Sequence, residues 1–303
     1  LDWSKAKKVE DNQENDSNEV VKRLAGDDRY ETAIKISKDN FKSADTVVLA
    51  SGTNSADALA ASSLATSKSA PILLTKRNEI GKNVFDEIKR LNANNVIVVG
   101  GKVSISEKVV SDLKNKNITV KRLAGDNRYE TSYEIAKELL KSNKAKEAII
   151  VNGFKNVDAL SVSSLATKEN LPILLNDGNR LSKDIKNIVG DSNIKKMYII
   201  GGRASLPRKI EDNIKDLNIE FERLAGEDRY ETSSKIAKYA YSSSDKVILA
   251  SGENSIDALA AGVLTKMEKA PMLLVQKRRI PKSISNRIEE SKAKKFLLIG
   301  GEK

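Results

Sequence analysis

Apolar residues follow two alternating spacings along this chain. Residues 47–50, 72–74 and 96–99 are short apolar runs bounded by Gly, Pro or Ser, which is typical of strands buried on both faces of a sheet. Between these runs, apolar residues recur at helical spacing in residues 31–41, 57–67, 83–91 and 107–113. Strands that alternate with helices imply right-handed crossovers, so the pattern predicts a doubly wound α/β unit with a parallel sheet.

This pattern of strands and helices occurs three times. The sequence Arg-Leu-Ala-Gly begins at Arg23, Arg122 and Arg223, and after two intervening residues each copy continues with Arg-Tyr-Glu-Thr. Each copy then contains Asp-Ala-Leu, an apolar run that begins with Pro, and a strand that ends in Gly-Gly. The repeat predicts three tandem Rossmann-like subdomains, arranged as a pseudo-threefold trimer.

The predicted subdomains cover residues 20–117, 118–218 and 219–303. Residues 1–19 match no part of the repeat, and their polar, acidic composition predicts a linker or the end of an upstream segment. In the first two copies a helical pattern follows the double glycine, at residues 104–113 and 206–217. The third copy stops at Lys303, so we expect its last helix to be missing.

The chain contains neither cysteine nor histidine. Their absence excludes disulfides, cysteine nucleophiles, zinc sites built on these residues and the commonest general base, so no metal site and no catalytic residue is predicted. No cofactor is expected, because the double glycines lack the Gly-x-Gly-x-x-Gly and Gly-Lys-Ser/Thr patterns that bind nucleotides. No apolar run approaches the roughly 20 residues that cross a bilayer, so we expect no membrane insertion.

Basic residues outnumber acidic ones. The sequence has 53 Lys and Arg against 42 Asp and Glu, a formal net charge of +11, which favours a polyanionic partner such as nucleic acid, an acidic membrane or a wall polymer. Nucleic acid is disfavoured, because neither an aromatic stacking platform nor a basic recognition element is visible. A solvated basic surface without a specific partner stays the alternative interpretation.

The basic residues concentrate directly after predicted strands. Ligands of doubly wound sheets bind at loops that follow the carboxyl ends of strands, and Arg or Lys in such loops suits phosphate or carboxylate groups. The candidate binding residues are Lys76, Arg77, Lys102, Arg180, Arg203, Lys277, Arg278 and Arg279. Ordinary solvated loop charges are the alternative interpretation of the same residues.

A second motif has a structural interpretation. Asp28 and Glu31 have the spacing of a helix N-cap and a carboxylate at the third helical position, and the spacing recurs at Asn127 and Asp228. Each polar group would satisfy a backbone N–H that the helix leaves unpaired. Arg29, within the motif, is expected to be held by neighbouring carboxylates.

Asp57, Asp158 and Asp257 stand at the start of a predicted helix in each copy. A carboxylate at this position complements the helix dipole. A carboxylate pair that performs acid–base chemistry stays open as an alternative, since the chain has no histidine to serve instead.

In combination, these motifs resemble a known family. Arg-Leu-Ala-Gly-x-x-Arg-Tyr-Glu-Thr, Ser-Gly-x-Asn-Ser-x-Asp-Ala-Leu-Ala, Pro-Ile-Leu-Leu and a strand ending in Gly-Gly, three times over residues 20–303, are similar to the cell-wall-binding repeat type 2 family of clostridial cell-wall and surface-layer proteins. The resemblance implies a pseudo-trimer of Rossmann-like modules that holds an exported protein non-covalently on an anionic, phosphate-bearing wall polysaccharide. It also implies a separate effector domain outside this chain.

The same resemblance assigns polymer binding to the Pro-Ile-Leu-Leu motif. The residues it implies are Pro71, Ile72, Leu73, Leu74, Pro172, Ile173, Leu174, Leu175, Pro271, Met272, Leu273 and Leu274. Our interpretation of the apolar pattern makes most of them a buried strand, so the two views agree if the motif positions the basic loop beyond it. Two departures weaken the equivalence of the copies: Met272 replaces Ile, and residues 152–155 read Asn-Gly-Phe-Lys in place of Ser-Gly-x-Asn.

The leading hypothesis is a non-catalytic module that anchors a secreted protein to the cell wall or surface layer of a Gram-positive bacterium. Its expected partner is an anionic cell-wall polysaccharide, with surface-layer proteins as further candidates. Two alternatives stay open: an enzyme with a carboxylate- or phosphate-binding site in the crevices between subdomains, and a nucleic-acid-binding protein.

Overall fold

Three parallel four-stranded sheets form the framework of the protein. The structure is a computed structural model that describes residues 20–142, 144–154, 160–253 and 256–301, so the predicted linker at residues 1–19 lies outside the described residues. In strand order, the first sheet contains β3 (Ile72–Thr75), β2 (Thr46–Ser51), β4 (Asn95–Val99) and β5 (Thr119–Leu123); the second contains β7 (Ile173–Asn176), β6 (Glu147–Asn152), β8 (Lys196–Ile200) and β9 (Glu220–Leu224); the third contains β11 (Met272–Val275), β10 (Lys246–Ser251), β12 (Lys295–Ile299) and β1 (Val20–Leu24). The predicted fold class, three repeated α/β subdomains with parallel sheets, is therefore confirmed.

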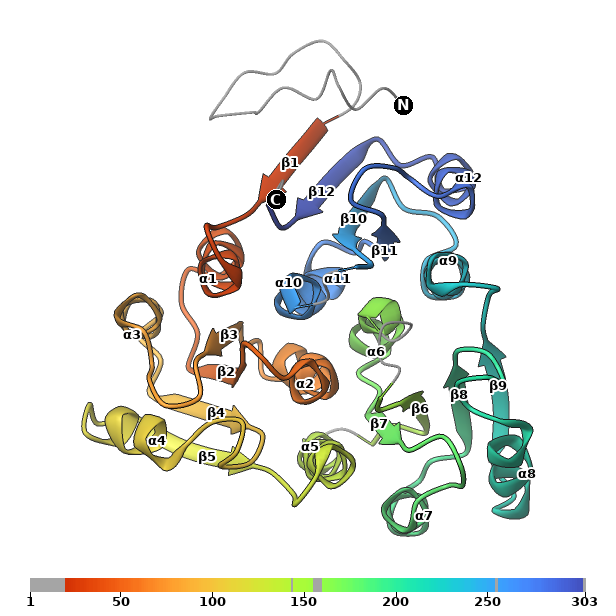
Figure 1. Ribbon diagram of the computed structural model, residues 1–303, viewed down its shortest axis with the longest axis horizontal. Coiled ribbons are helices and arrows are strands. Elements are labelled where there is room, and N and C mark those ends of the chain that lie inside the picture. Colours follow the sequence, from red (N-terminus) through yellow and green to blue (C-terminus); the bar gives the residue numbers. More distant parts are fainter. Residues whose placement is uncertain (1–19, 143, 155–159, 254–255, 302–303) are drawn as a thin grey trace.

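Helices alternate with the strands and surround the sheets (Figure 1). They are α1 (Arg29–Asn40), α2 (Ser55–Ser67), α3 (Lys82–Arg90), α4 (Glu107–Lys114), α5 (Arg128–Ser142), α6 (Ser163–Glu169), α7 (Lys183–Asp191), α8 (Arg208–Asp216), α9 (Arg229–Ala240), α10 (Ile256–Ala260), the short 3₁₀ helix η3 (Ala261–Val263), α11 (Leu264–Met267) and α12 (Lys282–Ser291). The four helices predicted in the first copy correspond to α1, α2, α3 and α4, which confirms the interpretation of the helical spacing.

The apolar pattern missed one strand in each copy. These strands are β1, β5 and β9, and each carries an Arg-Leu-Ala-Gly arginine as its second-last residue. Each lies at the edge of its sheet and mixes polar with apolar side chains, as in Thr-Val-Lys-Arg-Leu of β5, where only Leu123 is fully buried. A rule that searches for continuous apolar runs finds central strands and overlooks half-exposed edge strands such as these.

The sheets are offset from the sequence repeat by one strand. β5 follows the first double glycine, yet it pairs in parallel with β4 and completes the first sheet. β9 completes the second sheet in the same way by pairing with β8. In the third sheet this place beside β12 is taken by β1, from the other end of the chain, with Val20 opposite Lys295 and Leu24 opposite Ile299. The strand order therefore closes the three subdomains into a ring.

The centre of the ring is made of the second helices of the three copies. Helices α2, α6 and the α10–η3–α11 segment lie against one another there (Figure 1). Ser62, Ser163 and Gly262 occupy equivalent positions, and a Cβ atom added to Gly262 would lie 3.2 Å from the Ser62 Cβ and 3.3 Å from the Ser163 Cβ. Because the three backbones meet so closely, small residues are required at these positions.

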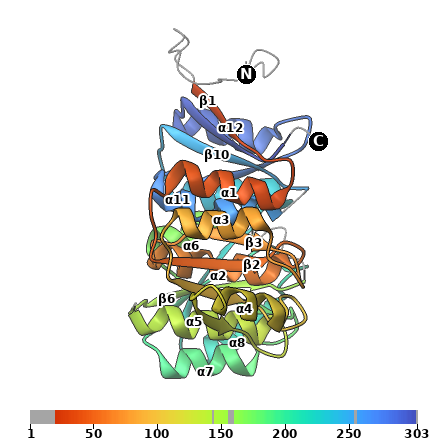
Figure 2. The same cartoon turned by 90° about the vertical axis from the view of Figure 1, so that its left-hand side faces the viewer.

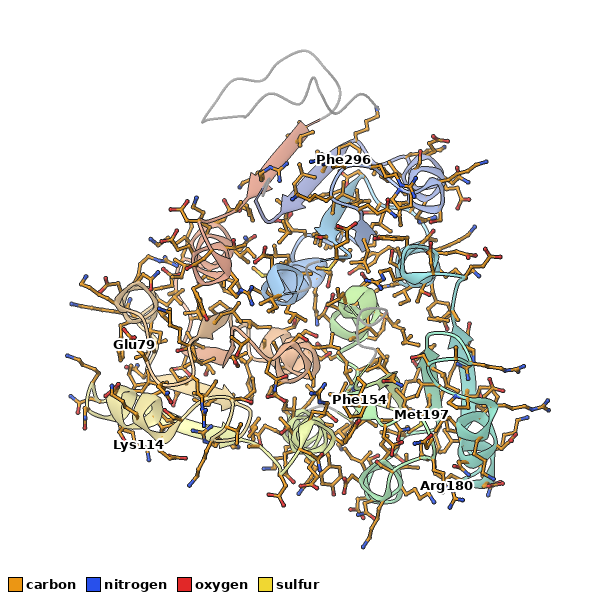
Figure 3. The ribbon with its side chains drawn as sticks, viewed as in Figure 1. Glu79, Lys114, Phe154, Arg180, Met197 and Phe296 are labelled. Carbon is orange, nitrogen blue, oxygen red and sulfur yellow. The ribbon has the colours of Figure 1, made fainter. Side chains whose placement is uncertain are left out.

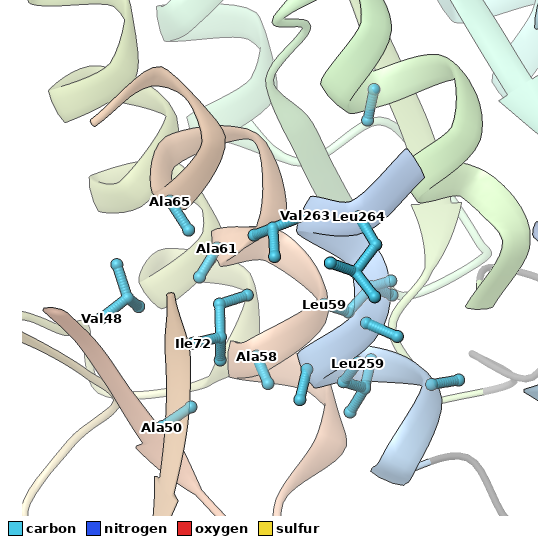
Figure 4. Packing of buried hydrophobic residues seen from close by; sticks show 14 of the residues in the cluster. Val48, Ala50, Ala58, Leu59, Ala61, Ala65, Ile72, Leu259, Val263 and Leu264 are labelled. Carbon is cyan, nitrogen blue, oxygen red and sulfur yellow. The ribbon is translucent and has the colours of Figure 1, made fainter. Parts of the chain in front are cut away.

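Apolar packing continues from the sheets into this centre. Figure 4 shows Val48 and Ile72 of the first sheet against one side of α2, while Leu59 on its other side faces Leu259 and Leu264. All five side chains are at most 4% exposed. One core cluster therefore includes residues of all three sheets, and the second subdomain has a further cluster of its own around Ile185 and Ile210. The shared cluster favours a rigid assembly over three independently moving units.

The packing between copies is also cyclic. The second helix of each copy contacts the first helix of the next, since α2 contacts α5, α6 contacts α9, and α10 contacts α1. Figure 2 shows that helices such as α1 and α7 run along the thin dimension of the molecule. The protein is therefore a flat ring whose strands and helices end on its two broad faces.

Candidate functional site

Three arginines bring the carboxyl ends of all three sheets to one face. Each is the first residue of a helix, and each donates a hydrogen bond from Nη1 to the carbonyl oxygen of the glycine after a strand in the next sheet. The bonds are Arg29 to Gly52 at 2.6 Å, Arg128 to Gly153 at 2.7 Å and Arg229 to Gly252 at 2.7 Å. Because every helix start is joined to the next sheet's strand end, these ends share one side of the ring, which we call the carboxyl face.

The hydrogen-bond partners of these arginines differ from the expected ones. We expected neighbouring carboxylates to hold Arg29, but its partner is the Gly52 carbonyl, whose sequence position lies 23 residues away. Both residues belong to one sequence copy, but the strand before Arg29 is part of the third sheet and Gly52 follows a strand of the first, a relation that the sequence does not signal. The arginine thus joins two subdomains, and Nη1 of its guanidinium is already engaged in this hydrogen bond.

The predicted helix caps are confirmed. The Asp28 carboxylate accepts a hydrogen bond from the Glu31 N–H at 2.9 Å, and the Glu31 carboxylate accepts one from the Asp27 N–H at 3.1 Å. Asn127 and Asp228 cap α5 and α9 through equivalent bonds. The caps fix where each helix begins and hence where its arginine points.

A buried carboxyl group of the first copy lies near an arginine of the second copy. Asp57 is 3% exposed, and its Oδ2 is 3.1 Å from Asn54 Nδ2 and 3.5 Å from the Ser104 hydroxyl. Burial raises the pKa of Asp57 from 3.8 to about 6, and the charge of Arg128 from the next copy opposes that rise. The partners of this carboxyl are an amide and a hydroxyl, which is the environment of a structural group more than of a carboxylate pair.

The third copy repeats this relation with the first. Burial raises the pKa of Asp257, and the charge of Arg29 opposes the rise. Asp158, the third predicted member, lies outside the described residues. In both described pairs, a carboxyl group of one copy thus interacts electrostatically with an arginine of the next.

Replacing Asp57 with asparagine is expected to stabilise the protein at pH 7 and to leave its stability at pH 4 almost unchanged. Between about pH 4 and 6 the folded state keeps a proton on Asp57 that the unfolded state has released, so the free energy of unfolding falls as the pH rises. The shift corresponds to about 3 kcal/mol at pH 7, which Asp57→Asn would recover. Urea unfolding at both pH values measures the effect, with the exposed Asp86→Asn as control. An equal change at both pH values would contradict the assigned titration.

The Pro-Ile-Leu-Leu residues are buried in all three copies. Ile72, Leu73 and Leu74 are at most 1% exposed, and their counterparts in β7 and β11 are equally inaccessible. Pro71, Pro172 and Pro271 are also buried. Without a change of fold these side chains cannot contact a polymer, so any role of the motif passes through the loop that follows it.

The eight basic residues predicted as binding residues are all exposed, and they divide into two groups. Lys102 lies 3.7 Å from the Glu107 carboxylate, Arg203 lies 3.3 Å from Glu211, and Arg279 donates a hydrogen bond to Gln276. The other five have no ion pair with any described residue. They are Lys76, Arg77, Lys277 and Arg278, together with Arg180. These five, which we call the free cations, have charges available to a partner.

The structure joins some of these loops and separates others. The Ser106 N–H donates to the Arg77 carbonyl at 2.8 Å, which ties the loop after β3 to the loop after β4. Loops of different copies lie apart: Figure 3 shows Glu79, from the loop after β3, and Arg180, from the loop after β7, at separate parts of the periphery. The free cations therefore form separate groups on one face.

Sequence reasoning missed Phe154 as a candidate. Its side chain is 67% exposed and is one of the few large apolar side chains at the surface of the described chain. Figure 3 places it nearer the centre of the ring than Glu79 or Arg180. The available signal was the departure of residues 152–155 from the Ser-Gly-x-Asn pattern, which puts an aromatic residue where the other copies have Thr53 and Glu253.

Neither a metal cluster nor a membrane span is evident in the described part of the chain. No group of three or more acidic side chains is placed to hold a metal ion there. No helix in that part is both long and apolar enough to cross a bilayer.

A ring of three α/β subdomains whose equivalent loops carry exposed cations on one face defines a triplicated binding module. The chain belongs to the cell wall binding domain 2 (CWB2) family, which it matches at residues 23–110, 122–211 and 223–303. The resemblance inferred from the motifs is thus confirmed, and the chain is a cell-wall-binding module.

Similar proteins include two from Bacillus subtilis (strain 168). The chain is 30% identical to N-acetylmuramoyl-L-alanine amidase LytC over 280 residues, which are 92% of this chain and 55% of LytC. It is 31% identical to the amidase enhancer over 304 residues, with 93% of this chain and 41% of that protein covered. The chain therefore spans about half the length of the curated relatives it matches.

Two solved structures from Clostridium difficile share the fold. Cwp6 superposes with a TM-score of 0.88 at 34% identity, covering 94% of this chain and 46% of that one. Cwp8 superposes with a TM-score of 0.86 at 31% identity, covering 93% of this chain and 49% of that one. Both similarities extend over all three subdomains, so the ring arrangement is common to the three proteins.

Proposed function

We propose that this module binds an anionic cell-wall polysaccharide non-covalently and retains an exported protein at the surface of a Gram-positive bacterium. The observation that carries the proposal is the set of free cations Lys76, Arg77, Arg180, Lys277 and Arg278, which project from equivalent loops on one face. Exposed Arg and Lys side chains bind phosphate or carboxylate groups through charge-assisted hydrogen bonds. The net charge of +11 adds a long-range attraction to such a polymer.

The arrangement of the three copies suits a repeating ligand. We infer that the subdomains act as a pseudo-trimer, in which the loops after β3, β7 and β11 contact successive charged groups of one polymer. Each exposed contact contributes about 1 kcal/mol or less, but linked contacts combine into firm retention. Because the attraction is between exposed charges, salt should weaken it.

The proposed role is non-catalytic. Asp57, the candidate acid or base, is 3% exposed and is hydrogen-bonded to Asn54, so a substrate has little access to it. LytC is named as an amidase, and this chain corresponds to only 55% of its length. In our proposal the shared segment holds the wall while any enzymatic or adhesive activity belongs to a different part of the whole protein. Surface-layer proteins are further candidate partners.

Retention on purified cell walls tests the proposal. The protein is expected to sediment with intact walls in low salt, to be released as the salt concentration rises, and to stay in solution when the anionic polymer has been removed chemically. Two controls measure nonspecific adsorption to the walls. One is bovine serum albumin, and the other is an unrelated basic protein of similar size and net charge. Undiminished retention on walls stripped of their anionic polymer would refute the proposed ligand.

A further inference from the structure

The second copy differs from the other two in its exposed loop chemistry. The loop after its Pro-Ile-Leu-Leu strand carries Asp177 and Arg180, whereas the corresponding loop of the third copy carries Lys277, Arg278 and Arg279. The loop of the second copy therefore has no net charge of its own. Cations alone give this copy little attraction for a polyanion.

The second copy instead exposes an aromatic ring on the same face. Phe154 directly follows Gly153, the glycine whose carbonyl oxygen accepts the Arg128 hydrogen bond, so it belongs to the carboxyl face. The Arg128 guanidinium carbon lies 5.1 Å from the centroid of the Phe154 ring. The Tyr129 ring meets it edge to face, with 6.0 Å between the centroids. Arg128 covers one face of the Phe154 ring and Tyr129 also contacts the ring, and the side chain is still 67% exposed.

The backbone under the ring is fixed. The Phe154 N–H donates to the Asn152 side-chain oxygen at 2.8 Å, and Asn152 Nδ2 donates to the Ser205 carbonyl at 2.7 Å. Serine occupies the Asn152 position in the other copies, as Ser51 and Ser251. Asparagine thus ties the loop of Phe154 to the loop after β8, so less backbone freedom is lost when a ligand binds.

We propose that Phe154 is a stacking platform for a sugar ring of the wall polysaccharide, in which the apolar C–H face of a pyranose lies on the open face of the phenyl ring. The inference rests on the proposed function, since it names how one copy recognises the same polymer. The π-face carries partial negative charge and attracts the polarised C–H bonds of a sugar, while both surfaces lose contact with water.

Charge contacts and aromatic stacking differ in how their strength depends on salt. Cation contacts weaken as salt increases, because counterions compete for the same charges. Stacking involves no net charge and persists in salt. Phe154 should therefore contribute an affinity that is independent of the salt concentration, and the free cations should contribute the salt-dependent part.

The experiment measures binding of the whole chain to purified walls over a series of salt concentrations. Phe154→Ala is expected to weaken binding about tenfold at every salt concentration, so that the plot of affinity against salt keeps its slope. Phe154→Trp should retain or improve the binding. Thr53→Ala, at the equivalent position of the first copy, is the matched control and should change the affinity less than twofold. Unchanged melting temperatures, expected for so exposed a side chain, establish that each variant is folded.

The outcomes separate this inference from the proposed function. Loss of binding in Phe154→Ala with recovery in Phe154→Trp supports stacking. A second variant carries Arg77→Glu together with Arg278→Glu. If Phe154→Ala binds the walls like the wild type while this double variant is released, the stacking platform is overturned and the proposed function stands. A Phe154→Ala variant with an altered salt slope also overturns it, because the ring would then act through the placement of Arg128. If neither variant changes the retention, the proposed function itself fails.

Discussion

Replacing Arg77, Arg180 and Arg278 together with glutamate is expected to abolish retention on purified walls at physiological salt. Each residue is an exposed free cation of a different copy, so each contact changes from attraction to repulsion. The variant's net charge falls from +11 to +5, which also weakens the long-range attraction. A loss of about 1 kcal/mol at each of three linked sites corresponds to roughly 100-fold weaker binding or more. Quantitative sedimentation with walls at two salt concentrations measures this loss.

A matched variant separates the carboxyl face from charge alone. Lys89, Lys114 and Lys215 lie in the last turns of α3, α4 and α8, at the opposite ends of helices that begin near the carboxyl ends of strands. Replacing these three lysines with glutamate gives the protein the same net charge as the arginine triple variant, but the changes lie on the opposite broad face. Retention of this variant should stay within a fewfold of that of the unmodified protein. Equal losses in both triple variants would show that overall charge, and no particular face, governs the binding.

Replacing Leu73 with alanine is expected to lower the free energy of unfolding by about 2–5 kcal/mol while leaving wall retention of the folded protein unchanged. Leu73 is fully buried in β3, so its truncation removes packing without removing a surface contact. Urea unfolding followed by circular dichroism measures the stability. Retention is compared at a temperature and protein concentration at which the variant is folded.

The equivalent residues provide replicates of this prediction. Leu174→Ala and Leu273→Ala should destabilise the second and third subdomains by a comparable amount, because both side chains are at most 1% exposed. A Leu73→Ala protein of unaltered stability that no longer binds walls would instead assign direct contact to the motif. Together with the arginine triple variant, the leucine variants distinguish a buried strand from the basic loop that it positions.

Central strands and amphipathic helices could be predicted from the sequence because their side-chain spacing reflects their burial. Residues 47–50 are apolar throughout, since β2 lies between two other strands and is covered by helices. The edge strand β1 could not be predicted in this way, because only Leu24 of its residues is fully buried. Its pairing with β12 joins residues from opposite ends of the chain, and no local pattern encodes that contact.

The sequence predicts which loops form the candidate site, but it predicts only some of the residues in them whose side chains are available for binding. The sequence places Arg203 and Arg180 after strands, but only the structure shows that Arg203 has a carboxylate partner in Glu211 while Arg180 has none among the described residues. The role of Arg128 in joining two subdomains was equally hidden, because Gly153 lies in a separate loop. Phe154 was visible as a departure from the repeat, yet its exposure and its contact with Arg128 require coordinates.

The pairing of β1 with β12 has a mechanical consequence for a protein held on a wall. The two strands are parallel and in register from Val20 opposite Lys295 to Leu24 opposite Ile299. A force that pulls the two ends of this chain apart therefore acts at opposite ends of the strand pair, on the Val20 side of β1 and the Ile299 side of β12. The strands must then slide past each other, so their backbone hydrogen bonds share the load and break together instead of opening one at a time. Tension between the chain ends is thus resisted by the same ladder that closes the ring.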